Sequence, residues 1–216
     1  APLETAYSIF QVLNLAERHG NVGLRISGYG AVGFLFSLTP LIRLSESYVR
    51  RGRALLSPDL DPMREVGFYR AALAASINHG VLPRIDPADL PRAMELAQKL
   101  GDLYAQMFLL AVQAQIEWLA GDEVRSRASV DALIEMARRS DHVIGLVLGK
   151  MLQSVQAQQR GRHAEALAAI DELALKAQRE GLSVYGSLSD ALRALGLARQ
   201  GLFAQAREVA DRSLAA

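Results

Sequence analysis

The sequence predicts an all-α protein, an array of antiparallel helix pairs with about 40 residues in each pair. Three observations support this fold class: glycines recur at a fixed interval, apolar residues follow helical spacing, and Ala and Leu supply most of the apolar residues. Half of the 216 residues are apolar, yet aromatic residues make up only 6%. This composition favours close helix–helix packing over a sheet core.

The repeat is visible in glycines that stand at the same place in successive units. Gly121, Gly161 and Gly201 follow one another at intervals of 40 residues. Two further rows keep this step, Ala97, Ala137 and Ala177, and Leu96, Met136 and Lys176, and each segment closes on Gly101, Asp141 or Gly181. Because independent rows share one register, the repeat extends over residues 96–216.

Each of these units divides into two helices. The first expected helix is 103–120, and a second runs from the stop at 121–122 to about 140. The others are 143–160, 162–180, 183–200, and 202 to the end. Glycine just past a helix end is the usual left-handed cap, because it has no Cβ to oppose a positive φ. On the helix at 162–180, the apolar face consists of Leu167, Ile170, Leu173, Ala174 and Ala177.

Upstream of residue 96 the repeat continues with less regular spacing. The segment Leu15–Gly20 resembles Leu96–Gly101 at an offset of 81, about two periods. Between them, prolines bound the helices expected near 22–38, 41–56, 64–80 and 88–100. No segment shows the alternating polarity of a strand, so the expected helices number ten or eleven.

The chain lacks a Ser/Gly-rich linker, which predicts one continuous repeat domain over residues 1–216. Its expected units are roughly 1–20 (a half unit), 21–61, 62–101, 102–141, 142–181 and 182–216. Helical sequence at both ends, and a start at Ala-Pro-Leu-Glu, suggest a fragment of a longer multidomain protein.

Charge and composition argue against several classes of function. The net charge is +1 and the sequence has no basic stripe, so direct nucleic-acid binding is not expected. No apolar run approaches the roughly 18 to 20 residues that cross a bilayer, so no membrane contact is expected, and the absence of cysteine fits a cytoplasmic protein. The chain has no cysteine, and its four histidines do not pair at metal-ligand spacing. We expect no catalytic residue, no cofactor and no metal.

Two of the glycine turns resemble those of the tetratricopeptide repeat. Ala166 follows Gly161 by five residues and Ala206 follows Gly201 by five, as in tetratricopeptide turns, where this Ala lets the two helices approach closely. Ser126 stands in the place of this Ala after Gly121. The resemblance implies a right-handed superhelix with a concave inner face. HEAT repeats, which also reach 40 residues, are the structural alternative.

The long period, together with the opening segment 15–33, is similar to the repeats of MalT-like regulators, bacterial STAND signalling ATPases and cyclase fusions. In those families the repeats bind an inducer or partner, and a separate nucleotide-binding domain switches. The resemblance implies a non-catalytic regulatory module that binds a protein, a peptide or a small-molecule inducer on its concave surface, with self-association as a further option. The alternatives are a passive scaffold for complex assembly and, remotely, a nucleotide-binding enzyme that uses Gly28–Gly33.

The candidate binding residues lie on the first helix of each unit, which lines the concave face in tetratricopeptide arrays. Aromatic and Arg side chains anchor interfaces disproportionately. The candidates are Tyr69, Tyr104, Gln115, Trp118, Gln158, Tyr185 and Arg193. Trp118 fits a core position equally well.

Some motifs have simpler structural explanations. Gly28, Gly30 and Gly33 match the dinucleotide-binding pattern, but no βαβ pattern surrounds them, so we expect them to serve helix packing. Arg50, Arg51 and Arg53, with Arg43 nearby, predict a solvated helix end, with an acidic partner or phosphate as the alternative.

Histidines and aspartates are expected to cap helices. His19 and His79 fall at predicted helix C-termini, where a partly protonated imidazole interacts favourably with the helix dipole. Acidic pairs beside prolines are typical of turns and N-caps, here Asp59 with Asp61 and Asp86 with Asp89.

Overall fold

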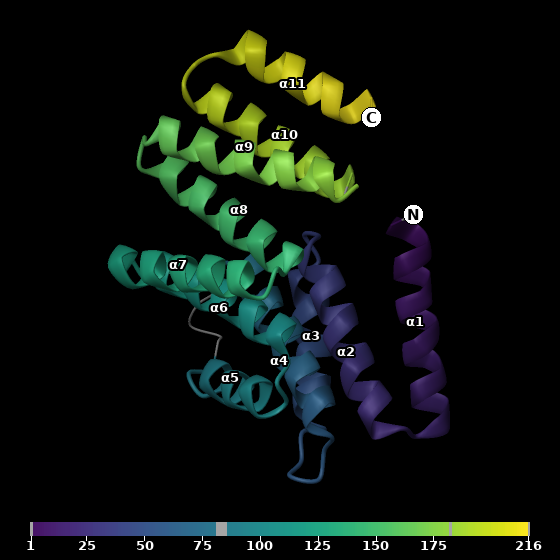
Figure 1. Cartoon of the computed structure of the whole chain (residues 1–216). Coiled ribbons are helices and arrows are strands. Elements are labelled where there is room, and N and C mark those ends of the chain that lie inside the picture. The colour runs from purple at the N-terminus through teal and green to yellow at the C-terminus, as the bar shows by residue number, and fades with distance from the viewer. Residues whose placement is uncertain (1, 81–85, 182, 216) are drawn as a thin grey trace. The chain divides into compact units, whose positions relative to one another are not determined.

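The computed structural model describes residues 2–80, 86–181 and 183–215, with the side chains of residues 2, 3, 5, 183–185, 214 and 215 left out. These residues form helices and turns, with no strand among them (Figure 1). The helices are α1 (Pro2–His19), α2 (Val22–Ser37), α3 (Ile42–Arg53), α4 (Pro62–Asn78), α5 (Asp89–Lys99), α6 (Leu103–Leu119), α7 (Glu123–Arg139), α8 (Val143–Gln159), α9 (His163–Arg179), α10 (Ser183–Arg199) and α11 (Phe203–Ala215). The all-α prediction is confirmed, and the helix ends expected from sequence lie within three residues of those observed.

The chain forms two compact units, Ala1–Ser126 and Arg127–Ala216, which we describe separately. In the first unit, consecutive helices from α1 to α6 pack against one another. In addition, α2 packs on α4, and α4 packs on α6. The pairing of each helix with its neighbour and with the next but one agrees with a helical repeat array. Its main core lies between α2, α4, α5 and α6, around the fully buried side chains of Ile26, Phe68, Leu73 and Leu109.

Glycines bring α2 close to its neighbours in the first unit. An added Cβ on Gly33 would lie 2.8 Å from Cγ2 of Val49 in α3, and one on Gly30 would lie 3.3 Å from Cβ of Ala71 in α4. On Gly28 it would lie 2.9 Å from Cδ1 of Leu13 in α1. The three glycines of the dinucleotide-like pattern therefore serve helix packing, as the sequence suggested.

The second unit repeats the arrangement with α8, α9, α10 and α11. Consecutive helices pack in pairs, and α8 also packs on α10. Its core contains Val147 of α8, Ile170 and Leu173 of α9, and Leu192 of α10. Here too a glycine permits a close approach, since a Cβ on Gly149 would lie 2.5 Å from Cγ1 of Ile134.

From Gly101 to Gly201 the turns recur every 20 residues, two to each 40-residue unit. Among the described residues, the glycines with a positive φ are Gly20, Gly80, Gly101, Gly121, Gly161, Gly181 and Gly201. Asp141 occupies the same left-handed conformation with φ 47°. The residue after the left-handed one donates back to the helix, as from Asp122 N to Glu117 O (2.9 Å). These 6→1 hydrogen bonds define Schellman caps, which satisfy carbonyls at the helix ends.

The position of the tetratricopeptide Ala is buried wherever the structure describes it. Ala166 and Ala206 are buried, and the Ser126 that replaces this Ala is buried completely. Its Oγ donates to the carbonyl of Ala114 on the preceding helix (2.6 Å). Ser45 does the same to Gly33, 12 residues earlier (2.7 Å). A hydroxyl at this position therefore costs little, because its hydrogen bond is made across the helix pair.

Candidate functional site

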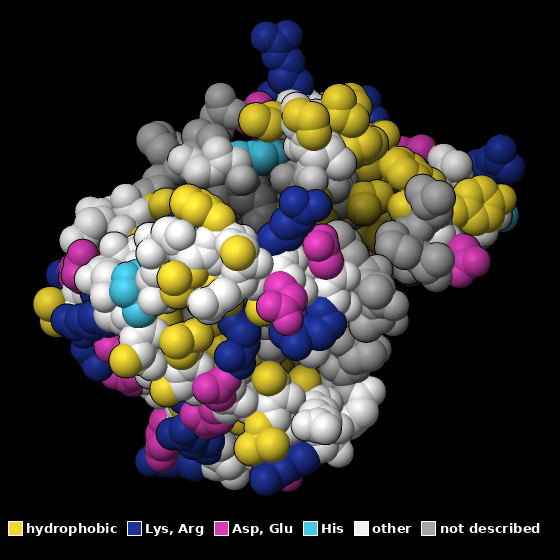
Figure 2. All heavy atoms as spheres, turned by 90° about the horizontal axis from the view of Figure 1, so that it is seen from above, with side chains coloured by type: hydrophobic (Ala, Val, Ile, Leu, Met, Phe, Trp, Pro, Cys, Tyr) yellow, Lys and Arg dark blue, Asp and Glu magenta, His cyan; other side chains and the backbone are white. Residues whose placement is uncertain are grey.

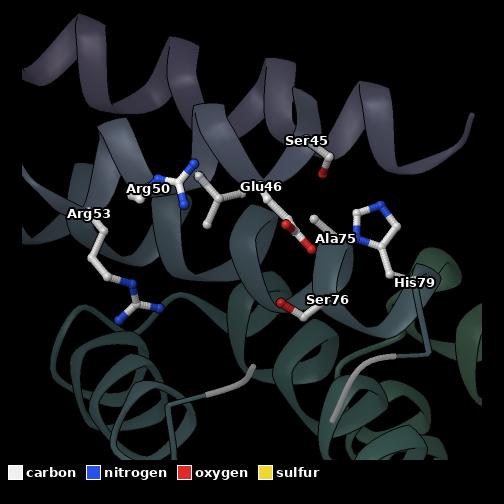
Figure 3. A pocket seen from close by; sticks show the side chains of 8 residues that line it. Ser45, Glu46, Arg50, Arg53, Ala75, Ser76 and His79 are labelled. Atoms are coloured by element: carbon white, nitrogen blue, oxygen red, sulfur yellow. The ribbon is translucent and has the colours of Figure 1, made fainter. Parts of the chain in front are cut away.

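A pocket of about 190 Å³ that is open to solvent lies between α3 and α4 in the first unit, lined by both apolar and polar groups (Figure 3). Helix α2 packs extensively on both α3 and α4, whereas these two touch each other much less. Helices α3 and α4 contact each other where Gly52 of α3 meets the ring of Phe68 of α4. Beyond it, the facing side chains of α3 are Ser45, Glu46, Val49, Arg50 and Arg53, and those of α4 are Ala75, Ser76 and His79.

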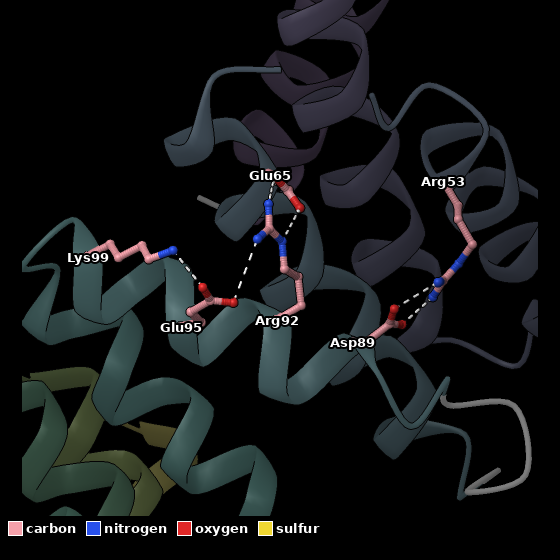
Figure 4. Close-up of polar contacts among 6 residues, drawn as sticks. All are labelled: Arg53, Glu65, Asp89, Arg92, Glu95 and Lys99. Atoms are coloured by element: carbon pink, nitrogen blue, oxygen red, sulfur yellow. Dashed lines mark hydrogen bonds and ion pairs between the residues drawn. The ribbon is translucent and has the colours of Figure 1, made fainter. Parts of the chain in front are cut away.

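One end of the pocket is cationic, and Figure 3 shows Arg50 and Arg53 there. Arg53 is held by a bidentate ion pair with Asp89, the first residue of α5, whose side chain is only 5% exposed (Figure 4). The hydrogen bond to Asp89 raises the pKa of Arg53. Arg50 is exposed and forms no ion pair with any other described residue.

The same ion-pair network fixes α5 against the walls of the pocket. Arg92 of α5 donates from Nε to Glu65 of α4 (3.0 Å), and Glu95 accepts from Lys99 (2.6 Å), as Figure 4 shows. Glu65 and Asp89 are both buried, so their pairing with Arg side chains avoids the cost of uncompensated buried charge. Arg53 is therefore positioned from outside the pocket by α5.

The other end of the pocket holds Glu46, Ser76 and His79 (Figure 3). Ser76 Oγ donates to the carbonyl of Ala72 one turn earlier (3.0 Å). Nε2 of His79 is buried and has no hydrogen-bond partner among the described residues, and Oε1 of Glu46 is also shielded from solvent. Burial lowers the pKa of His79 from its ordinary 6.5. The pocket thus places a guanidinium at one end and a carboxylate, a hydroxyl and an imidazole at the other.

These positions correct three expectations drawn from the sequence. His79 caps the C-terminus of α4 as predicted, but burial disfavours the protonated form that the helix dipole would favour. Asp61 is the N-cap of α4 as predicted, whereas Asp89 pairs with Arg53 instead of capping α5, whose N-cap is Ala88. Arg53 accordingly does not belong to a solvated helix end.

Four of the candidate binding residues lie in the first unit. Tyr69 is buried in the core beside Phe68, and burial raises its pKa. The ring of Tyr104 lies beneath the guanidinium of Arg70 (4.5 Å to the centroid) and is half-buried. Gln115 donates to Ala111 on its own helix, and Trp118 is half-buried. None of the four lines the α3–α4 pocket.

The other three candidates lie in the second unit. Gln158 is buried, and its Nε2 donates to the carbonyl of Leu192 (3.0 Å), which ties α8 to α10. Arg193 is paired with Asp171 of α9. The side chain of Tyr185 lies outside the described residues. The contacts of Gln158 and Arg193 both join helices within this unit.

From the sequence, Arg50 was expected only as part of a basic cluster, and neither Glu46 nor Ser76 was predicted as a site residue. The missed signal is a spacing: Ser45, Glu46, Val49, Arg50 and Arg53 recur at helical intervals. Polar residues occupy this stripe where a packing helix would carry apolar ones.

Over the described ranges, no three His, Cys, Asp or Glu side chains gather into a group that could hold a metal ion. Among the helices described, none is long and apolar enough to cross a membrane. Figure 2 shows Lys and Arg side chains interspersed with Asp and Glu on the face it draws, without a stripe of one charge.

Comparisons of the chain with protein-family models, with characterised proteins and with solved structures give no match. The case for a function therefore rests on the site itself.

Proposed function

We propose that this chain is a non-catalytic, ligand-sensing regulatory module that binds a small molecule between α3 and α4. The observation that carries the proposal is the pocket of about 190 Å³, whose lining combines apolar surface with the polar ends of a few side chains. Elsewhere in the unit, the main contact between helices is made by apolar side chains, as in the core around Phe68 and Leu73. A concave pocket with a few convergent polar groups is the usual form of a small-molecule site.

In this proposal the repeat array transmits occupancy of the pocket to a neighbouring domain or partner. A ligand that contacts both α3 and α4 favours one spacing of these two helices, and α2 and α5 pack against α4. The array would be a right-handed tetratricopeptide-like superhelix, and the parent a regulator of the MalT or STAND kind. The first assignment rests on the glycine and alanine turns described above, and the second on the long repeat period and the opening segment 15–33.

Thermal unfolding with a library of small metabolites tests the proposal. A ligand present at 100 times its Kd adds about 2.7 kcal/mol to the free energy of unfolding. For a chain of this length, this corresponds to a rise in Tm of roughly 5 to 10 °C. Amide NMR of the same complex should place the largest shift changes in α3 and α4. A library without any hit at these helices would contradict the proposal.

One observation favours the alternative of a protein scaffold. Four large apolar side chains are exposed around the turn from α2 to α3, namely Leu38 (63%), Leu41 (48%), Ile42 (39%) and Leu44 (44%). Adjacent exposed apolar residues are typical of protein contact surfaces. If Leu41→Glu abolished binding to a partner while the pocket bound no small molecule, the scaffold would be the better description.

A further inference from the structure

Helix α3 carries an apolar stripe that remains largely exposed. Leu41, Leu44 and Tyr48 recur at helical intervals, so they lie along one side of this helix, and we call them the α3 stripe. Leu41 and Leu44 are exposed, and Tyr48 is half-buried. The side of α3 that packs on α2 is a different one, where Ser45 donates to the carbonyl of Gly33. Because a helix normally buries an apolar stripe against another element, the α3 stripe is suited to a partner.

The apolar surface around the α3 stripe extends onto α2. Leu38, the C-cap residue of α2, is exposed and precedes the turn that leads into the stripe. The ring of Tyr48 stacks on Phe36 of α2 (5.8 Å between centroids), and Phe36 in turn contacts Phe10 of α1 (5.9 Å). These ring contacts hold Tyr48 in place, which lowers the entropy that it loses when a partner binds. Adjacent exposed apolar side chains of this kind are typical of protein contact surfaces.

The charges beside the α3 stripe are positive. Arg43 is exposed and forms no ion pair with another described residue, and the guanidinium of Arg51 lies over the ring of Tyr48 (5.4 Å to the centroid). Between residues 21 and 53 the sequence has a single acidic residue, Glu46, and this residue lines the pocket. Arg43 and Arg51 are eight residues apart, which separates them by about 12 Å along the helix axis. Carboxylates at a matching separation would complement them.

We propose that the α3 stripe docks an acidic amphipathic helix of a partner protein, with apolar residues on Leu41, Leu44 and Tyr48 and carboxylates toward Arg43 and Arg51. A helix is the form that fits, because a second helix lying alongside buries a stripe of this spacing. The stripe of a second copy of this chain would not fit, because the facing Arg side chains of the two copies carry like charges. This inference goes beyond the proposed small-molecule site and does not depend on it.

Fluorescence anisotropy of designed peptides with the full chain tests the proposal. One labelled peptide of about four helical turns, roughly 14 residues, would carry Leu at positions a and d of each heptad and Glu at e and g. A second peptide has Lys in place of every Glu, and a third has the residues of the first in an order without an apolar stripe. We expect the Glu peptide to bind about tenfold or more tightly than either control, and added salt to weaken its binding.

Two matched pairs of variants assign the binding to the α3 stripe and its charges. Leu44→Gln should weaken binding of the Glu peptide about tenfold, whereas Val124→Gln replaces a still more exposed apolar side chain on α7 and should change nothing. Arg43→Gln should weaken binding about threefold. Arg179→Gln removes an exposed cation from α9 and should change nothing, nor should Ser76→Ala in the pocket. Circular dichroism would confirm that all five variants are folded.

Each other outcome overturns the inference in a distinguishable way. If the Lys peptide or the rearranged peptide binds as tightly as the Glu peptide, the surface does not recognise an acidic amphipathic helix. An unchanged affinity in Leu44→Gln would place the peptide elsewhere on the chain, and equal losses in Arg179→Gln and Arg43→Gln would show a general charge effect. If vesicles of phosphatidylcholine and phosphatidylserine bind the chain while the Glu peptide does not, the surface contacts an anionic membrane and the proposed protein partner is wrong.

Discussion

Replacing Gly33 by Ala tests the close packing of α2 on α3. The new Cβ would lie 2.8 Å from Cγ2 of Val49, 3.3 Å from the carbonyl oxygen of Ser45 and 3.4 Å from the backbone N of Val49. Two of these atoms are backbone, so relief requires α3 itself to shift by a few tenths of an ångström. Overpacking of this kind typically costs about 1–3 kcal/mol.

The helix propensity of Ala offsets part of this cost. Exchanging Gly for Ala inside a helix stabilises it by roughly 1 kcal/mol, which leaves a net loss of about 1 kcal/mol for Gly33→Ala. Gly67 is the matched control, because it is an exposed helical glycine with no atom within 4 Å of an added Cβ. Gly67→Ala should therefore stabilise the chain by about 1 kcal/mol.

Gly28 should give an intermediate result. Its added Cβ would lie 2.9 Å from Cδ1 of Leu13, which can rotate away, but also 3.2 Å from Cβ and 3.4 Å from Cα of Leu13, so α1 must yield slightly. We expect the order of stability Gly67→Ala, then wild type and Gly28→Ala, then Gly33→Ala. The span of about 2 kcal/mol corresponds to roughly 4–8 °C in Tm, and urea unfolding followed by far-UV circular dichroism measures it. A Gly33→Ala variant as stable as the wild type would refute the reasoning.

Five further substitutions test four features of the fold. Arg162 is the N-cap of α9 without a side-chain hydrogen bond, so Arg162→Asp should raise the free energy of unfolding by about 1 kcal/mol in urea titrations. Asp141 has a left-handed φ of 47°, and Asp141→Gly should stabilise by roughly 0.5 kcal/mol, because strain relief exceeds the added chain entropy. Glu172 pairs with Lys150, whose side chain is only 8% exposed (2.6 Å); Glu172→Gln should cost about 2 kcal/mol, after discounting for the exposure of the carboxylate, whereas Lys150→Met should change stability by less than about 1 kcal/mol. Burial lowers the pKa of His79, so the unfolded chain takes up this proton at higher pH than the folded chain does. The contribution of neutral His79 to the free energy of unfolding is therefore complete above about pH 6.5 and is lost as the pH falls through the folded pKa. His79→Gln should flatten that part of the pH profile measured by thermal unfolding.

Each of these predictions has a result that would contradict it. Arg162→Ala removes the charge without adding a cap, and an Asp variant no more stable than this one would count against capping. A loss of stability in Asp141→Gly would mean that its exposed ion pair with Lys176 (3.5 Å) outweighs the strain. Equal losses of stability in Glu172→Gln and Lys150→Met would show that Glu172→Gln does not leave the charge of Lys150 buried without a partner. An unchanged pH profile in His79→Gln would assign the titration to other groups.

The sequence predicted the helices and turns because local chemistry determines them. Gly121, Gly161 and Gly201 end helices for a reason that acts within a few residues, the ease of a positive φ. Asp141 could be placed in the same row because Asp tolerates this conformation better than most residues. The prediction that Gly33 packs against a helix succeeded for a similar reason, since an all-helical pattern leaves few other uses for a run of small residues.

The pocket could not be predicted in this way, because it depends on two helices that diverge. Glu46 and Arg50 are typical of a solvated helix face, and nothing local indicates that His79 of another helix lies opposite them. Residue type alone did not distinguish surface contacts from buried positions, because the size and hydrogen-bonding capacity of Tyr and Gln also suit a buried side chain. Tyr69 and Gln158 are both buried, although they were chosen as contact residues for a surface.

The presence of polar side chains between α3 and α4 has a structural explanation, which also bears on how variants of the pocket are read. Helix α2 packs on both of these helices, and α5 fixes them through Arg53 and Glu65, so the unit does not depend on contact between α3 and α4 along their whole length. Polar residues can therefore line this space without weakening the core around Phe68. It follows that Arg50 and Ser76 can be replaced with little effect on folding, so a loss of binding in these variants would report the pocket's chemistry rather than its collapse.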